Sequence, residues 1–406
     1  MKKIIIFLSC ILLLTSCSLQ KYSSTTLPST ENSATIYITS IPSSEASIES
    51  TVPMTSSAPT VPTILETTTP VDPIELLINA MSLEEKVGQL FLARCPASGA
   101  LESISQYHLG GYILFGSDFD NQDPISMQNI IQNYQDASEI PLLIAVDEEG
   151  GTVCRVSSHD TFRDTRFPSP RSLYDNGGID FVLQTETKKC ILLSSLGINV
   201  NMAPVCDIST DPNAFMYSRS LGQAPETTGA FIKSTVLLMD QYHIGSVLKH
   251  FPGYGNNSDT HTGIAIDNRP LEELESSDLV PFRYGIQSNC GAILVSHTFV
   301  NAMDSEMPAS LSLPVHQYLR NQMNFNGVIV TDDLVMHAIT DQYGAEEAAV
   351  LAILAGNDLL CSSEFDIQYT AVLNAVKSGR IPQDTLNASV YRLLTWKQNL
   401  GLLNFS

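Results

Sequence analysis

Gly245-Ser246-Val247-Leu248-Lys249-His250-Phe251-Pro252-Gly253-Tyr254-Gly255-Asn256-Asn257-Ser258-Asp259-Thr260-His261 is the most informative stretch of this sequence. It opens as an apolar run with the composition of a buried strand, and a cation and an imidazole, Lys249 and His250, follow at once. Glycines and a proline then turn the chain, and the stretch closes with Asp259 two residues before His261. No packing requirement calls for this combination. A strand end followed by such a loop predicts a site that binds a polar substrate and delivers a proton to it.

The strand-like pattern recurs along the chain. Seven more short apolar runs occur, and helical patterns such as Gln184–Leu196, Thr227–Tyr242 and Ala345–Leu354 lie between most of them. Runs that are apolar on both faces and alternate with helices indicate a buried parallel sheet. About eight such units across roughly 330 residues predict one α/β domain, a TIM-like (β/α)8 barrel. A doubly wound open sheet is the alternative, because periodicity alone does not show closure. The eight runs are Gln89–Ala93, Gly111–Phe115, Leu142–Val146, Ile198–Met202, Ser246–Leu248, Ala292–Val295, Val328–Val330 and Asp358–Leu360.

The composition limits the partners of the chain. It has 406 residues, of which 43% are hydrophobic, and a formal net charge of -22. Nucleic-acid phosphates are bound by Lys and Arg, so this acidic balance argues against nucleic acid as a partner and against electrostatic binding to an anionic membrane surface. The glycine pairs Gly110-Gly111 and Gly150-Gly151 lack the spacing of a dinucleotide-binding loop, which disfavours a nucleotide fold.

The N-terminal segment has the pattern of an export signal. Two lysines precede the apolar run Ile4–Leu14, which is too short to span a bilayer as an ordinary helix. Small residues then lead to Cys17, as in a bacterial lipoprotein signal, which predicts lipid attachment at Cys17 and an extracytoplasmic protein anchored to the cell membrane. An ordinary secretory signal with an incidental cysteine is the alternative. The expected organisation is a signal peptide over 1–17, a disordered Ser/Thr/Pro-rich tether over 18–71, and one catalytic barrel over 72–406.

Local signals near both ends of the expected barrel mark helix ends. Asp72-Pro73 predicts a capped helix start, and Ser82-Leu83-Glu84-Glu85 predicts a capping box for a second helix. A terminal helix over Asn387–Leu400 is expected to stop at Gly401. The apolar face expected for the first helix comprises Ile74, Leu76, Leu77 and Met81.

Six cysteines lie beyond the signal, and no two of them form a close CxxC pair. Zinc and redox motifs are therefore not expected, and no metal site is predicted. Several of the six lie in apolar runs, which indicates buried small residues. Export would permit a disulfide, but the sequence identifies no pair. The six are Cys95, Cys154, Cys190, Cys206, Cys290 and Cys361.

Polar side chains follow five of the eight apolar runs, at the point where each predicted strand ends. In a barrel of parallel strands these ends share one rim, where the active sites of this fold lie. A single Asp after a strand is more often a helix cap, but five strands that end this way favour a site. These residues are Asp147-Glu148-Glu149 with Arg155 nearby, Asp207, Lys249-His250, Ser296-His297 and Thr331-Asp332-Asp333.

Asp332 is the predicted nucleophile. A carboxylate held rigidly at a strand end can attack an anomeric carbon and form a covalent glycosyl intermediate, while its neighbour Asp333 caps the next helix. His261 is the predicted acid/base, because imidazole titrates near neutrality, and Asp259 can accept its other N–H and fix its tautomer. The structural alternatives are that Asp332 and Asp333 are both helix caps and that His261 is a surface residue. The residues expected to hydrogen-bond sugar hydroxyls are Asp147, Arg155, Lys249 and His250.

With these residues assembled, the chain from about Leu83 to its end resembles the family 3 glycoside hydrolases, and within them the bacterial β-N-acetylglucosaminidase branch. The Asp-x-His loop of the opening stretch separates that branch from the β-glucosidases of the same family. The other segments that carry the resemblance are Met81–Leu90, Asp147–Gly151 with Val153 and Arg155, Asn201–Ile208, Ser218–Gly222 and Gly327–Met336.

The resemblance implies a retaining exo-β-N-acetylglucosaminidase without metal or cofactor, in which Asp332 is the nucleophile and His261, paired with Asp259, replaces the usual second carboxylate. It implies β-linked N-acetylglucosamine in peptidoglycan- or chitin-type fragments as substrate, with muropeptides favoured. The implied substrate contacts are Asp147, Arg155, Arg219, Lys249 and His250. The branch commonly has His where Tyr254 stands and often Ser where Thr331 stands, so one loop contact differs.

Two other functions fit the same residues. A β-N-acetylglucosaminide phosphorylase is one, because a histidine acid/base repels an incoming phosphate less than a carboxylate would. A sugar-binding lipoprotein that has lost catalysis is the other, although the presence of Asp332, Asp259 and His261 argues against it.

Overall fold

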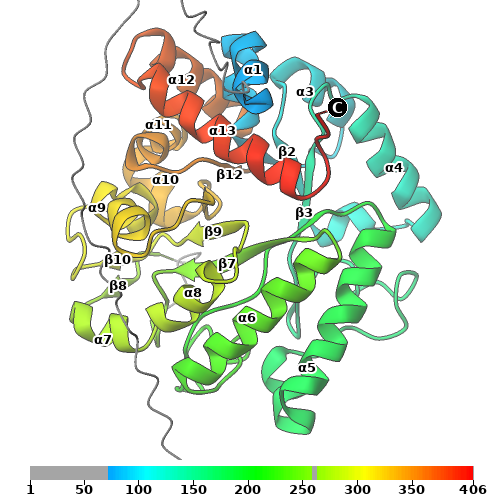
Figure 1. Cartoon of the computed structure of the whole chain (residues 1–406), viewed down its shortest axis with the longest axis vertical. Coiled ribbons are helices and arrows are strands. Elements are labelled where there is room, and N and C mark those ends of the chain that lie inside the picture. The colour runs from blue at the N-terminus through cyan, green and yellow to red at the C-terminus, as the bar shows by residue number, and fades with distance from the viewer. Residues whose placement is uncertain (1–71, 258–262, 406) are drawn as a thin grey trace, which may run out of the picture. The chain divides into compact units, whose positions relative to one another are not determined.

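A computed structural model describes residues 72–257 and 263–405 of the chain (Figure 1). Eight parallel strands form one sheet in the order β11-β9-β7-β6-β3-β2-β1-β12. The two outer strands of that order also meet, because Val330 bridges Leu359 and the amide of Thr331 donates to the Leu359 carbonyl at 3.1 Å. The sheet is therefore a (β/α)8 barrel rather than an open sheet. The strands are β1 (Phe91–Arg94), β2 (Gly111–Leu114), β3 (Leu143–Val146), β6 (Val200–Asn201), β7 (Gly245–Phe251), β9 (Ala292–Val295), β11 (Val328–Thr331) and β12 (Leu360–Ser362).

Each predicted apolar run overlaps one of these strands, although Asp358–Leu360 shares only Leu360 with β12. The run Gln89–Ala93 is divided, because Gln89 ends a helix and β1 begins two residues later. Strand β7 is longer than predicted and includes Lys249 and His250. Both side chains are therefore fixed by strand hydrogen bonding rather than carried by the loop that follows.

Helices cover the barrel, and α5, α6 and α8 lie side by side along one part of it (Figure 1). Short strands outside the barrel are β4 (Glu148–Gly150) with β5 (Val153–Cys154), and β8 (Ile266–Asp267) with β10 (Phe299–Val300). The α-helices are α1 (Pro73–Ala80), α2 (Leu83–Gln89), α3 (Ala100–Tyr107), α4 (Pro124–Asp136), α5 (Pro170–Ser195), α6 (Pro225–Gln241), α7 (Leu271–Ser276), α8 (Leu279–Ile286), α9 (Leu313–Gln317), α10 (His337–Tyr343), α11 (Ala345–Ala355), α12 (Phe365–Lys377) and α13 (Gln383–Asn399).

The predicted helix starts are confirmed. The Asp72 carboxylate accepts the amide of Ile74 at 2.8 Å, and Ser82 and Glu85 cap α2 reciprocally, as the capping-box pattern requires. The apolar face predicted for α1 was wrong in one residue. Ile74 and Ile78, four residues apart, are buried, so Leu76 points away between them and is 56% exposed.

A tryptophan fills the end of the barrel at which the strands begin. Trp396 of α13 is 5% exposed and meets apolar side chains of β1, β3, β6, β7 and β11. Gly245 and Gly291 make room for its ring. A Cβ at Gly291 would lie 2.0 Å from the indole nitrogen, and one at Gly245 would lie 2.8 Å from Cζ2. This end of the barrel is therefore closed by packing, and its glycines are required by the close approach of the indole.

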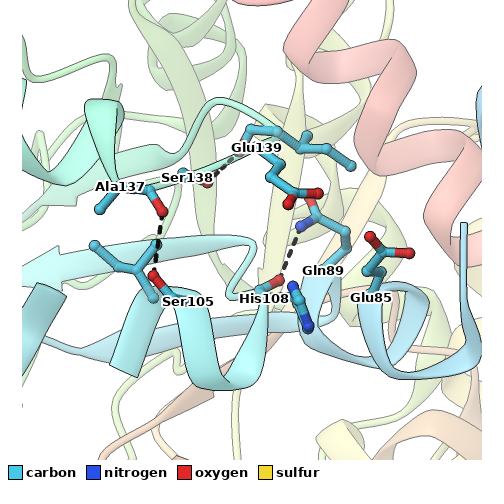
Figure 2. Close-up of a pocket in the computed structure, with 9 residues that line it drawn as sticks. Glu85, Gln89, Ser105, His108, Ala137, Ser138 and Glu139 are labelled. Atoms are coloured by element: carbon cyan, nitrogen blue, oxygen red, sulfur yellow. Dashed lines mark hydrogen bonds between the residues drawn. The ribbon is translucent and has the colours of Figure 1, made fainter. Parts of the chain in front are cut away.

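The next residue, Lys397, is fully buried at the same end. Its Nζ donates to Gln89 Oε1 at 2.7 Å, and Gln89 Nε2 donates in turn to the His108 carbonyl at 2.9 Å. Figure 2 shows Gln89 and His108 beside a small pocket of about 90 Å³ that also includes Glu85 and Glu139. Burial lowers the pKa of Lys397 to about 7, because an ammonium group loses its hydration there.

The six cysteines beyond the signal are all buried, as the apolar runs around several of them predicted, and each is a free thiol in the described part of the chain. Across residues 72–257 and 263–405, none of the helices has the length and apolar character needed to cross a membrane.

Candidate active site

A cavity of about 800 Å³ opens where the barrel strands end, and six of its lining residues are the predicted nucleophile and the five predicted substrate contacts, while Asp333 lines it as well. They reach it from different parts of the chain, since they follow or end strands β3, β7 and β11 or lie on the connections between strands. The barrel topology thus brings them to one rim, as the pattern of polar strand ends predicted. The six are Asp147, Arg155, Arg219, Lys249, His250 and Asp332.

Asp147 links two cations at the end of β3. Its Oδ1 accepts Lys249 Nζ at 2.7 Å, and its Oδ2 lies 3.4 Å from Arg155 Nη2. The Lys249 side chain is only 3% exposed. Burial alone would lower the pKa of Lys249, but the carboxylates of Asp147 and Glu149 outweigh it and raise the pKa above its usual value. Lys249 therefore remains an ammonium that donates into the cavity.

Glu149 is the hub of the charged network, although it does not line the cavity. Its two oxygens accept Arg219 Nε at 2.9 Å and Nη2 at 2.7 Å, and Oε1 also lies 2.6 Å from Lys249 Nζ. The side chain is 1% exposed. Burial alone would raise the pKa of Glu149, but Arg219 and Lys249 hold it far below its usual range. A buried carboxylate thus fixes the two cations beside the cavity.

Glu148, which lies between these two acids in the sequence, stabilises a loop. Its carboxylate accepts the amides of Arg155 at 2.9 Å and Val156 at 2.8 Å, and it also bonds Ser157 through the amide and the hydroxyl. The residue is fully buried. It folds the loop after β5 and so places the Arg155 side chain beside Asp147.

His250 is oriented by Asp207, which follows β6. The Asp207 carboxylate lies 2.8 Å from His250 Nδ1 and accepts the amides of His250 at 3.1 Å and Tyr254 at 2.7 Å. On the other side of the ring, Arg219 Nη2 lies 3.3 Å from Nε2. A guanidinium only donates, so Nε2 accepts and the ring proton sits on Nδ1, facing Asp207. His250 is thus held in one orientation by partners on both sides of its ring.

The paired acids after β11 have different environments. Asp333 accepts the amide of Val335 at 3.2 Å and both the amide and hydroxyl of Ser363, which follows β12. Burial raises the pKa of Asp333, and these hydrogen bonds offset part of the increase. Asp332 lines the cavity and accepts the Asp333 amide at 2.9 Å. The expectation that one acid caps the next helix is wrong, because α10 begins at His337 and Asp333 instead caps a turn and joins the segment after β12. Both acids line the cavity.

Aromatic side chains complete the wall of the cavity. The Phe115 ring lies 5.1 Å from the Arg155 guanidinium carbon, and the Phe215 ring lies 5.1 Å from that of Arg219. Tyr254 is 1% exposed and meets His250 edge-on, with ring centroids 5.2 Å apart. The cavity wall thus combines aromatic rings with charged side chains, which suits a sugar with apolar faces and hydroxyl edges.

Two predicted catalytic residues, Asp259 and His261, lie outside the described residues, as does Cys17. Within the described parts of the chain, no group of three or more His, Cys, Asp or Glu side chains is arranged to hold a metal ion.

No specific role was predicted from the sequence for Glu149 or for Asp207. Both lay in motifs or at strand ends that had been noted, but nothing local distinguishes the acid that faces the cavity from the one that is buried behind it. Glu149 meets its partner Arg219 from 70 residues away, and Asp207 meets His250 from 43 residues away.

Comparisons with known proteins fit this site. The family described as "Glycosyl hydrolase family 3 N terminal domain" matches residues 82–396. The chain is 31% identical over 327 residues to Beta-hexosaminidase A of Pseudoalteromonas piscicida, which covers 74% of this chain but 55% of that protein. It is also 31% identical over 329 residues to Beta-hexosaminidase LpqI of Mycobacterium tuberculosis, covering 78% of this chain and 83% of that protein.

Solved structures agree. A family 3 β-N-acetylglucosaminidase from Paenibacillus sp. strain FPU-7 superposes with a TM-score of 0.74 at 31% identity, covering 80% of this chain and 65% of that one. M. tuberculosis LpqI superposes with a TM-score of 0.73 at 28% identity, covering 80% of this chain and 96% of that one. The similarity therefore extends over the whole barrel and includes the segments that line the cavity.

Proposed function

The chain belongs to glycosyl hydrolase family 3 and is a glycoside hydrolase, and from that premise we propose that it is a retaining exo-β-N-acetylglucosaminidase. It removes terminal β-linked N-acetylglucosamine from peptidoglycan- or chitin-type fragments. Two matched relatives are named β-hexosaminidases and a similar structure is a β-N-acetylglucosaminidase, which supports this choice of sugar.

One observation carries the proposal. Asp332 lines the same cavity as Lys249, His250 and Arg219, so a carboxylate shares the cavity with polar side chains that are fixed in place. Donors held by buried carboxylates can bind sugar hydroxyls without reorganising when the substrate arrives. A sugar bound by them would present its anomeric carbon to a carboxylate on the cavity wall.

In the proposed mechanism, Asp332 attacks the anomeric carbon while His261 protonates the leaving oxygen, which yields a covalent glycosyl-Asp intermediate and the free aglycone. Water, deprotonated by the now neutral His261, then attacks the same carbon and releases the sugar with its original anomeric configuration. Asp259 orients His261. Asp147, Arg155, Arg219, Lys249 and His250 bind the sugar.

Trapping the intermediate tests the nucleophile. The protein is inactivated with a 5-fluoro N-acetylglucosaminyl compound and digested, and the labelled peptide is identified by mass spectrometry. The label is expected on Asp332. A label on any other residue would reject the assignment, while NMR of the first-formed sugar checks that the β-configuration is retained.

Phosphorolysis is separated from hydrolysis in the same assay. With phosphate added to an aryl N-acetylglucosaminide reaction, a hydrolase yields free N-acetylglucosamine, whereas a phosphorylase yields N-acetylglucosamine 1-phosphate. We expect the free sugar. A non-catalytic binding protein would show equal aryl release from the parent and from Asp332→Asn.

We further propose an extracytoplasmic location for the protein, with lipid attachment at Cys17 after removal of residues 1–16 and a tether over 18–71. Metabolic labelling with a radioactive or clickable fatty acid is expected to mark the parent protein and not the Cys17→Ala variant. Equal labelling of the two would reject Cys17 as the anchor.

A further inference from the structure

We propose that a buried ion pair on α5, Glu186 with Lys189, positions the sugar-binding cations and so controls substrate affinity from outside the cavity. The inference rests on the proposed function, because it assigns a role in the binding of that substrate. Neither residue lines the cavity, so both are positioning residues rather than catalytic ones.

Lys189 reaches the charged network through the backbone. Its Nζ donates to the main-chain carbonyl of Glu149 at 2.5 Å and pairs with Glu186 Oε1 at 2.8 Å. The two side chains are 2% and 5% exposed. Glu149 is therefore held from both sides. Its carbonyl accepts a buried ammonium from α5, and its carboxylate accepts Arg219 and Lys249 from the rim.

The hairpin that carries Glu149 rests on the segment that leads into α5. The Gly151 amide donates to the Phe167 carbonyl at 2.8 Å, and a Cβ at Gly150 would lie 2.3 Å from the Pro168 carbonyl oxygen. Lys189 Nζ also lies 6.0 Å from the centre of the Phe167 ring. The hairpin is thus fixed by backbone contacts at Gly150 and Gly151, and by one charged contact at Glu149.

A break in helix α5 allows Lys189 to contact this hairpin. It begins beside the hairpin at Pro170 and is interrupted at Gly178, whose φ of 64° and ψ of -162° are not helical. The residues after the break bring Glu186 and Lys189, three apart on one face, back to the Glu149 carbonyl.

A shift at Glu149 would be transmitted to the sugar. Glu149 bonds both Arg219 and Lys249, and Arg219 in turn contacts His250. If the charged contact at the Glu149 carbonyl is lost, the hairpin can move, and Arg219, Lys249 and His250 can shift from the positions in which they bind the sugar. Displacements of about an ångström in positioning groups can cost roughly 10²-fold in catalysis, so a clear loss of affinity is expected.

The test is the double variant Glu186→Gln/Lys189→Met, which removes both buried charges and leaves none unpaired. We expect KM for an aryl N-acetylglucosaminide, and the inhibition constant of N-acetylglucosamine, to rise by about tenfold or more. Lys397→Met is the matched control. It removes a buried lysine side chain at the other end of the barrel and should leave both constants unchanged. A loss of folded protein alone would lower the apparent kcat and leave KM as it was.

If the double variant does not fold, the single variant Glu186→Gln tests the positioning role of the ion pair. It keeps the shape of the side chain but removes the charge that aims Lys189 at the carbonyl, and both constants should rise at least about twofold. Parent values of KM and the inhibition constant in a folded variant would overturn the proposal. Full activity of Asp332→Asn would instead reject the proposed function, so the two failures are distinguishable.

Discussion

At the ends of the barrel strands, Glu149 binds Arg219 and Lys249 beside a cavity of about 800 Å³, whereas at their beginnings Trp396 fills the barrel and leaves no space for a ligand. The same strands contribute to both ends. Buried ion pairs add little net stability once the cost of removing charges from water is counted, while burial of a large aromatic side chain adds several kcal/mol. We infer that packing around Trp396 contributes much of the free energy of unfolding. The charged end around Glu149 contributes little to it and instead holds the cations in place.

The strongest test of this division is Asp332→Asn. The amide cannot serve as the nucleophile, so kcat for an aryl N-acetylglucosaminide is expected to fall roughly 10⁴-fold. The melting temperature should change far less than kcat, because asparagine has the same shape and its side-chain oxygen can still accept the Asp333 amide. Asp333→Asn is the matched comparison. It disturbs the bonds to Ser363 and Val335 and is expected to lower the melting temperature.

Trp396→Ala is expected to show the opposite behaviour. Loss of the only tryptophan of the chain leaves a cavity among the strand beginnings and should lower the free energy of unfolding by about 3–5 kcal/mol. Urea unfolding followed by far-UV circular dichroism measures this. The folded variant should keep the parent kcat/KM. A loss of activity without a loss of stability would contradict the separation of the two ends. The free energy of unfolding of Trp396→Phe should lie between those of the parent and Trp396→Ala.

Glu149→Gln tests whether the charged end contributes stability through its carboxylate. The variant leaves Arg219 and Lys249 buried without their shared anion, which should lower the free energy of unfolding by about 3 kcal/mol at neutral pH. Because the folded pKa of Glu149 lies below its unfolded value of about 4.5, the parent's advantage is complete above that pH and shrinks as the pH falls below it.

Stability measured at pH 7 and at pH 4 checks the sign. The difference between parent and Glu149→Gln should be smaller at pH 4. A difference that grows toward low pH would mean that Glu149 is protonated in the folded state and does not hold the cations.

The smallest change in the free energy of unfolding is expected at Lys397, because its amine is buried at the apolar end of the barrel. Its folded pKa of about 7 lies below the unfolded value of 10.5, so the unfolded chain binds more protons between these values and the parent gains stability as the pH rises through that window. Relative to Lys397→Met, the parent should gain roughly 2 kcal/mol between pH 7 and pH 9. A difference that does not vary with pH would show that the amine keeps its usual pKa. Comparing the two proteins cancels the titration of buried cysteines and tyrosines.

Much of this molecule could be predicted from local sequence. Every predicted apolar run overlaps a barrel strand, the caps at Asp72 and Ser82 formed, and α13 ends just before Gly401. Six of the predicted site residues line one cavity because strand ends in a parallel barrel must share a rim. These features depend on periodicity and on the order of strands, which a sequence displays directly.

The tertiary structure alone decided which of several similar residues does what. Asp147, Glu148 and Glu149 are adjacent acids, yet one faces the cavity, one folds a loop and one is buried between two cations. Trp396 closes the barrel because it meets Gly245 and Gly291, more than 100 residues away along the chain. Burial and charge pairing depend on neighbours that arrive from distant segments, so a residue's own surroundings in the sequence do not determine them.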